Sequence, residues 1–142
     1  MKNNTIPRGI YFLKQGDNIV YIGQSVNIHN RVKQHAIENT KVFDSFSYKI
    51  VDENLSLDDI EVEEIVKYRP KYNLTLPSNN KYTNISYVRD MFGKSICDII
   101  EPVFNVIKIG KKKYIDIDEV EEVKASLLKS VHSFRDNNIF KV

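Results

Sequence analysis

The sequence predicts an α+β protein in which a small three-stranded antiparallel sheet flanked by helices precedes a small, mostly helical domain. Two segments of alternating apolar residues, 9–13 and 19–23, are separated by five turn-forming residues, which is typical of a β-hairpin. Apolar residues then recur at helical spacing, alternate again over 46–51, and return to helical spacing before Pro70. The first part of the chain therefore has the predicted order β-β-α-β-α.

The first predicted helix begins after Ser25 or Asn27, because either side chain can accept a hydrogen bond from the first helical turn. It runs for about three turns and ends near Asn39. Its predicted apolar face consists of Ile28, Val32 and Ala36. Arg31 and His35 are four residues apart, so they are predicted to share one face.

The second predicted helix begins after Ser56 or Asp58 and must end before Pro70, which cannot continue it. Its predicted packed face consists of Leu57, Ile60, Ile65 and Tyr68. This spacing places Glu61 on the packed face of the helix as well.

The segment 76–80 combines a proline with three small polar residues and is the predicted linker, which gives domains over 1–77 and 78–142. In the second domain we predict short helices over 85–92 and 96–100, then strands over 106–109 and 114–115. A closing helix begins near Asp118, and its apolar stripe consists of Val120, Val123, Leu127, Val131 and Phe134.

The composition of the 142 residues, 42% hydrophobic and 28% charged, is that of a soluble globular chain. The net charge is +2, and residues 1–77 hold ten basic and ten acidic residues, so charge alone indicates no partner. One cysteine and three histidines exclude a disulfide framework and a four-ligand zinc site. No apolar run or secretory signal is present, which predicts a cytoplasmic, nucleoid-associated protein that does not contact a membrane.

Five elements in order resemble the GIY-YIG nuclease domain over about residues 7–77. They are Gly9-Ile10-Tyr11, Tyr21-Ile22-Gly23, Arg31 ten residues after the second tyrosine, Glu61, and Asn73 twelve residues after Glu61. The resemblance implies the GIY-YIG fold and a metal-dependent DNA endonuclease that uses Mg²⁺ or Mn²⁺.

The residue types suit phosphodiester hydrolysis. Glu61 offers a hard oxygen ligand to Mg²⁺ or Mn²⁺, and Glu64 is the alternative metal ligand. Arg31 carries a planar donor fork that matches phosphate oxygens and the charge of the transition state. The resemblance implies a general base among the candidate catalytic tyrosines, Tyr11 and Tyr21. It also implies a supporting or proton-transfer role for His35 and a site-fixing role for Asn73.

Each of these residues also has a purely structural interpretation, as strand packing, a solvated helix face or a surface charge. Gly9 and Gly23 fit either close backbone approach or plain turn geometry. Gln24 stands where some family members have a lysine, and it can still donate a hydrogen bond. We include Gln24 and Lys33 among the predicted DNA contacts.

The second domain resembles a winged-helix or excisionase-like DNA-binding module. In that interpretation its helix pair approaches a groove while a lysine-rich turn approaches phosphates. The predicted DNA contacts in this domain are Arg89, Lys94, Lys111, Lys112 and Lys113. The alternative is a small packing domain whose lysines are simply solvated.

The sequence thus predicts a metal-dependent DNA endonuclease of the homing, restriction or phage type, with the second domain giving DNA targeting. The alternative is a non-catalytic DNA-binding regulator built on the same scaffold. A double-strand cut from one active site needs a dimer or two sequential nicks, so a homodimer is one option. The helix from Asp118 could then supply either core or interface.

Overall fold

The computed structural model describes residues 7–134, with side chains to residue 130. Two compact units divide the chain, and the first continues to Asn79, two residues beyond the boundary predicted from the linker. It also includes the tip of a later hairpin, Ile109–Lys112, and the second unit holds the rest.

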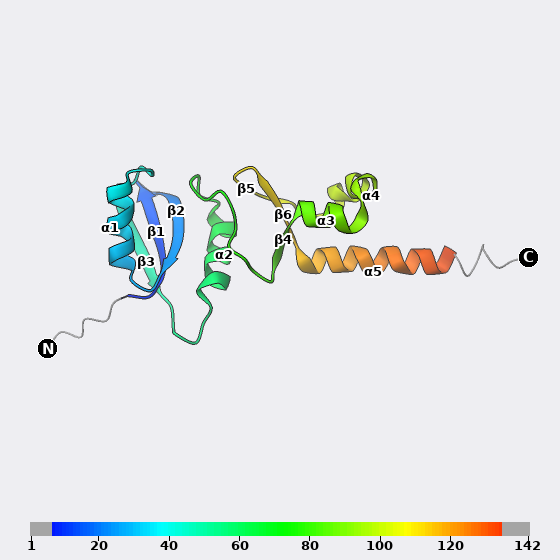
Figure 1. Cartoon of the computed structure of the whole chain (residues 1–142), viewed down its shortest axis with the longest axis horizontal. Helices are drawn as coiled ribbons and strands as arrows, with labels where there is room; N and C mark the ends of the chain where they lie inside the picture. The colour runs from blue at the N-terminus through cyan, green and yellow to red at the C-terminus, as the bar shows by residue number, and fades with distance from the viewer. Residues whose placement is uncertain (1–6, 135–142) are drawn as a thin grey trace, which may run out of the picture. The chain divides into compact units, whose positions relative to one another are not determined.

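The first unit contains the predicted three-stranded antiparallel sheet (Figure 1). Its strands are β1 (Gly9–Gln15), β2 (Asn18–Ser25) and β3 (Ser45–Ile50), in the order β2-β1-β3. Gly16, at a φ of 59°, makes the tight turn between β1 and β2. The predicted hairpin is confirmed, and β1 is the central strand.

Two helices, α1 (Ile28–Glu38) and α2 (Leu57–Tyr68), lie on opposite sides of this sheet (Figure 1). Asn27 caps α1 by accepting a hydrogen bond from the Asn30 backbone amide, and Ser56 caps α2 in the same way. The first unit therefore has the β-β-α-β-α order that the sequence predicts.

The buried face of α1 differs from the prediction at one position. Ile28 and Val32 are buried as expected, but Ala36 is exposed and His35 takes the inward place. The predicted packing of Ala36 is wrong because the His35 ring is hydrogen-bonded to buried Tyr11 beneath the helix.

The face of α2 that packs on the sheet consists of Glu61, Val62 and Ile65. The predicted burial of Tyr68 is wrong, since 44% of this residue is exposed. Tyr68 lies at the end of the helix, where its ring makes an edge-to-face contact with Phe12 and Lys67 Nζ lies 4.9 Å from its ring centroid. The predicted burial of Glu61 is confirmed, with 7% of the residue exposed.

The second unit holds the short strands and helices expected there, with two additions. Its elements are β4 (Tyr82–Asn84), α3 (Ile85–Phe92), α4 (Lys94–Ile100), a 3₁₀ helix (Glu101–Val103), β5 (Ile107–Ile109), β6 (Lys112–Asp116) and α5 (Ile117–Phe134). The strand β4 and the 3₁₀ helix were not predicted from the sequence. The strand β4 pairs with β6 in a sheet of order β4-β6-β5.

The helices and sheet of the second unit enclose their own apolar core. Its buried members are Ile85, Val88, Cys97, Ile100, Phe104, Ile115 and Val120. Val123 of α5 packs against this core, whereas the predicted contributions of Val131 and Phe134 lie outside the described side chains. None of the helices within 7–134 is long and apolar enough to span a membrane.

Candidate active site

The tyrosines of the two strand motifs lie together on the face of the sheet that α1 covers. Tyr11 is paired with Gly23, and Tyr21 with Leu13, so the tyrosines are diagonal neighbours on adjacent strands. Their ring centroids are 6.2 Å apart. Tyr11 is almost fully buried, whereas Tyr21 is partly exposed and borders a cavity.

The Tyr11 hydroxyl forms a 2.8 Å hydrogen bond with Nε2 of His35. Burial lowers the pKa of His35, and the positive charges of Arg31 and Lys41 lower it further. The ring is therefore neutral at neutral pH. Because its centroid is also 5.2 Å from that of Tyr21, His35 joins the two tyrosines into one cluster.

Arg31 lies at the edge of this cluster. Its Nη1 donates a 2.6 Å hydrogen bond to Gln34 Oε1 and is 3.9 Å from Glu38 Oε1. Burial raises the pKa of both tyrosines, and the Arg31 guanidinium opposes that rise at each of them. Both phenols therefore carry their protons at neutral pH, and Arg31 is a cation that favours the phenolate.

Glu61 reaches the cavity from α2. Burial raises the pKa of its carboxyl, a hydrogen bond from Gln24 lowers it, and the negative charge of Asp58 raises it again. The neighbouring alternative, Glu64, instead accepts a 2.6 Å hydrogen bond from Lys49 and forms an ion pair with it. The structure thus separates the two glutamates, with only Glu61 at the cavity.

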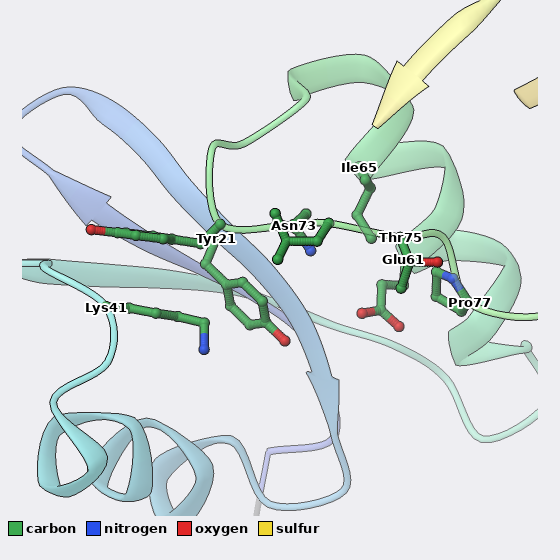
Figure 2. Close-up of a pocket in the computed structure, with 9 residues that line it drawn as sticks. Tyr21, Lys41, Glu61, Ile65, Asn73, Thr75 and Pro77 are labelled. Atoms are coloured by element: carbon green, nitrogen blue, oxygen red, sulfur yellow. The ribbon is translucent and has the colours of Figure 1, made fainter. Parts of the chain in front are cut away.

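The cavity has a volume of about 380 Å³. Figure 2 shows the Tyr21 hydroxyl and the Glu61 carboxylate directed toward one another across it. Its lining consists of Tyr21, Lys41, Glu61, Ile65, Tyr72, Asn73, Leu74, Thr75 and Pro77. Lys41 was not predicted from the sequence as a site residue. Its Nζ lies 4.6 Å from the Tyr21 ring centroid, and this contact joins the loop after α1 to a different strand.

Asn73 fastens the loop after α2 to the middle of β2. Its Oδ1 accepts a 2.9 Å hydrogen bond from the Ile22 amide, and its Nδ2 donates a 2.8 Å hydrogen bond to the Ile22 carbonyl. Asn73 is 7% exposed, so both bonds are shielded from water. This pair of bonds fixes β2, which carries Tyr21, relative to the loop that lines the cavity.

Replacing Asn73 with alanine should destabilise the protein by about 2 to 5 kcal/mol, because two buried backbone groups of Ile22 lose their partners. Urea denaturation measures this change in the free energy of unfolding. Asn30→Ala, on the exposed side of α1, is the matched control and should change it by less than about 0.5 kcal/mol. Equal stabilities for the two variants would contradict the anchoring role.

Close packing explains why positions 9 and 23 are occupied by glycine. Neither has a positive φ, so the turn-geometry interpretation is wrong for both. A Cβ atom on Gly9 would collide with the Lys49 carbonyl on β3. A Cβ atom on Gly23 would collide with the phenol of Tyr11, which lies directly over it. Gly23 therefore provides the space that the Tyr11 ring occupies.

The Gly23→Ala variant should lose about 1 to 3 kcal/mol of stability, because the Tyr11 ring must move from a packed position. The same substitution should cost less in a Tyr11→Leu background, where the phenol is absent. Thermal denaturation of the single and double variants gives this coupling. Additive losses would show that the collision with Tyr11 is not the cause.

The predicted DNA contacts are dispersed. Gln24 donates to Asp58 and Glu61 from its amide nitrogen, and Lys33 is exposed on α1. In the second unit, Arg89 and Lys113 both pair with Glu101, at 3.9 and 3.2 Å. Lys94 of that unit is exposed. Lys111 and Lys112 belong to the hairpin tip grouped with the first unit, where Lys111 is exposed and Lys112 Nζ donates a 3.4 Å hydrogen bond to Thr75 Oγ1.

The donors at the cavity fit a hydrated divalent cation. Mg²⁺ is commonly held by one or two carboxylates, with water and substrate oxygens completing its shell. Glu61 supplies one such carboxylate at the cavity wall. Within residues 7–134, no three His, Cys, Asp or Glu side chains are grouped as a metal-binding cluster.

Several relatives share sequence with the chain, although no protein-family model matches it. UvrABC system protein C of Caldicellulosiruptor saccharolyticus is 29% identical over 99 residues, which are 62% of this chain and 16% of that protein. The protein of the same name from Caldanaerobacter subterraneus is 33% identical over 106 residues, covering 62% of this chain and 17% of that protein. The chain therefore spans a small part of the length of these relatives.

Two solved structures that resemble the chain are of the same domain. The GIY-YIG N-terminal endonuclease domain of UvrC from Thermotoga maritima, as a Y43F mutant bound to its catalytic divalent cation, is 23% identical with a TM-score of 0.43. The match covers 53% of this chain and 100% of that domain. The magnesium-bound form is 24% identical with a TM-score of 0.41, covering 51% of this chain and 99% of that domain. The resemblance of the chain to the GIY-YIG nuclease family, predicted from its sequence motifs, is confirmed by its UvrC relatives.

Proposed function

We propose that the protein is a metal-dependent DNA endonuclease. The single observation that carries this proposal is the cavity in which a buried carboxylate, Glu61, faces the Tyr21 hydroxyl. The cationic groups of Arg31 and Lys41 lie close to the same tyrosine. Phosphodiester hydrolysis requires a carboxylate that binds the metal cation, a base that accepts a proton from water, and positive charge that binds the phosphate. These residues supply all three.

The residues take distinct roles in this proposal. Glu61 holds Mg²⁺ or Mn²⁺, which when bound neutralises charge on the scissile phosphate and stabilises the leaving oxygen. Tyr21, in its phenolate form, would accept the proton of the attacking water and become the neutral phenol, while Arg31 binds the phosphate and favours the phenolate. Tyr11 and His35 are buried behind Tyr21 and hold it in place. Asn73 fixes the strand on which Tyr21 lies.

The second unit is proposed as the DNA-targeting module of a homing, restriction or phage-type nuclease. Support comes from its β-α-α-β-β-α element order and from its basic residues Arg89, Lys94 and Lys113. Arg89 and Lys113 are already oriented by Glu101, so phosphate must compete with that carboxylate for them. A homodimer would let one active site per chain cut both strands.

The test is cleavage of a supercoiled plasmid and of a branched DNA, each with and without Mg²⁺ or Mn²⁺. We expect nicked or linear product only when the cation is present. DNA binding without cleavage of either substrate would favour the non-catalytic regulator instead. Binding is therefore measured in parallel by gel mobility shift on the same two substrates.

A further inference from the structure

Gln24 forms a bridge between two carboxylates of α2. Its Nε2 lies 2.5 Å from Asp58 Oδ1 and 2.6 Å from Glu61 Oε2. An amide nitrogen carries two hydrogens, so each can be donated to one carboxylate. The reversed amide would place its oxygen against two carboxylate oxygens without a hydrogen between them. The side chain is therefore held in one orientation.

The bridge joins two elements at the edge of the cavity. Asp58 and Glu61 are three residues apart on α2, which places them on neighbouring positions of one helix face. Asp58 is exposed and Glu61 is buried, and Gln24 follows Gly23 on β2. A glutamate side chain has three rotatable bonds, and its terminal torsion is broad, so a second contact is needed to fix the plane of the carboxylate. Gln24 supplies that contact.

We propose that Gln24 and Asp58 are positioning residues of the metal site, which rests on the proposed function of Glu61 as the metal ligand. Gln24 fixes the Glu61 carboxylate, while Asp58 holds Gln24 and adds a second negative charge close to the cation. Hydrogen-bond partners of metal ligands typically change metal affinity by about 10- to 100-fold. An exposed charge also acts on a cation within the Debye length of about 8 Å.

Binding of Mn²⁺ to the full chain without DNA tests this proposal directly, using the electron paramagnetic resonance signal of free Mn²⁺ as the readout. Gln24→Met and Asp58→Ala should each weaken binding about tenfold or more. The double variant should lose little beyond Asp58→Ala alone, because that substitution already breaks the bridge and removes the charge. Asp58→Asn keeps the acceptor oxygen but not the charge, so its affinity for Mn²⁺ should lie between those of the wild type and Asp58→Ala.

Asp59→Ala is the matched control, since it removes an exposed carboxylate from the same helical turn without touching Gln24. It should change Mn²⁺ affinity by at most about twofold. Thermal denaturation shows that each variant is folded, and a merely structural bridge would lower the melting temperature without weakening Mn²⁺ binding to the folded protein.

Two results overturn the inference, and they are distinguishable. If Glu61→Gln loses Mn²⁺ binding while Gln24→Met and Asp58→Ala bind Mn²⁺ like the wild type, Glu61 is the metal ligand but Gln24 and Asp58 do not position it. If the wild type shows no binding that depends on Glu61, the proposed metal site fails and the positioning role fails with it.

Discussion

Glu61→Gln should lower the rate of metal-dependent DNA cleavage by at least about 10³-fold, because a bound cation contributes several kcal/mol of transition-state stabilisation. The amide keeps the size of the side chain but is a neutral, weaker ligand. Stability should not fall, since burial raises the pKa of Glu61 and so disfavours its charged form in the folded protein. Plasmid nicking at saturating Mg²⁺, together with a thermal denaturation curve, separates the two effects.

Glu64→Gln is the matched control for this experiment. Glu64 is on the same helix, three residues further along, but its carboxylate is bound to Lys49. We expect Glu64→Gln to cleave at the wild-type rate. Loss of cleavage in Glu64→Gln, with activity retained in Glu61→Gln, would assign the metal ligand to Glu64 and overturn the proposed site.

The choice between these glutamates shows how much of the site could be predicted from sequence. Counting back from Asn73 and following the apolar face of the second helix both indicate Glu61. The structure places Glu61 at the cavity and Glu64 on Lys49. Helical periodicity and turn chemistry are local properties, so they predict the hairpin and the β-β-α-β-α order without knowledge of tertiary contacts.

Contacts between distant elements could not be predicted in this way. The bridge from Gln24 to Asp58 joins residues 34 positions apart, and no periodicity links a strand to the first turn of a later helix. Lys41 meets Tyr21 through the course of a loop. His35 replaces Ala36 on the packed face because Tyr11 provides a buried hydrogen-bond partner. Tertiary packing overrides the local apolar pattern at that position.

Short elements were missed for a related reason. The strand β4 has three residues, too few to show alternation, and it forms because β6 offers a pairing edge. Gly23 is the reverse case, because the sequence motif indicated the position but not why it must be glycine. The structure gives the reason, since the Tyr11 ring occupies the space that a Cβ atom would need. A motif can therefore identify a position whose physical cause lies in another strand.

Arg31→Ala should lower the cleavage rate by at least about 10²-fold, because it removes the cation that favours the phenolate of both tyrosines. Arg31→Lys should recover part of the loss, since it restores charge but not the planar donor fork. Lys67→Ala removes one positive charge from the exposed face of α2 and should leave the rate unchanged. Single-turnover cleavage at saturating protein and Mg²⁺ isolates the chemical step from DNA binding.

The pH dependence of that step tests how Arg31 acts. The pKa of Tyr21 is raised above its ordinary value, so a tyrosine base is mostly protonated at neutral pH and the rate should increase about tenfold per pH unit from about pH 7 to about pH 9. The guanidinium lowers that pKa, so its removal should lower the rate by a constant factor below the wild-type pKa and move the plateau of the profile to higher pH. A variant profile that levels off at the same pH as the wild type would show that Arg31 acts on the phosphate and not on the Tyr21 pKa. A wild-type rate that is independent of pH would exclude a tyrosine as the base.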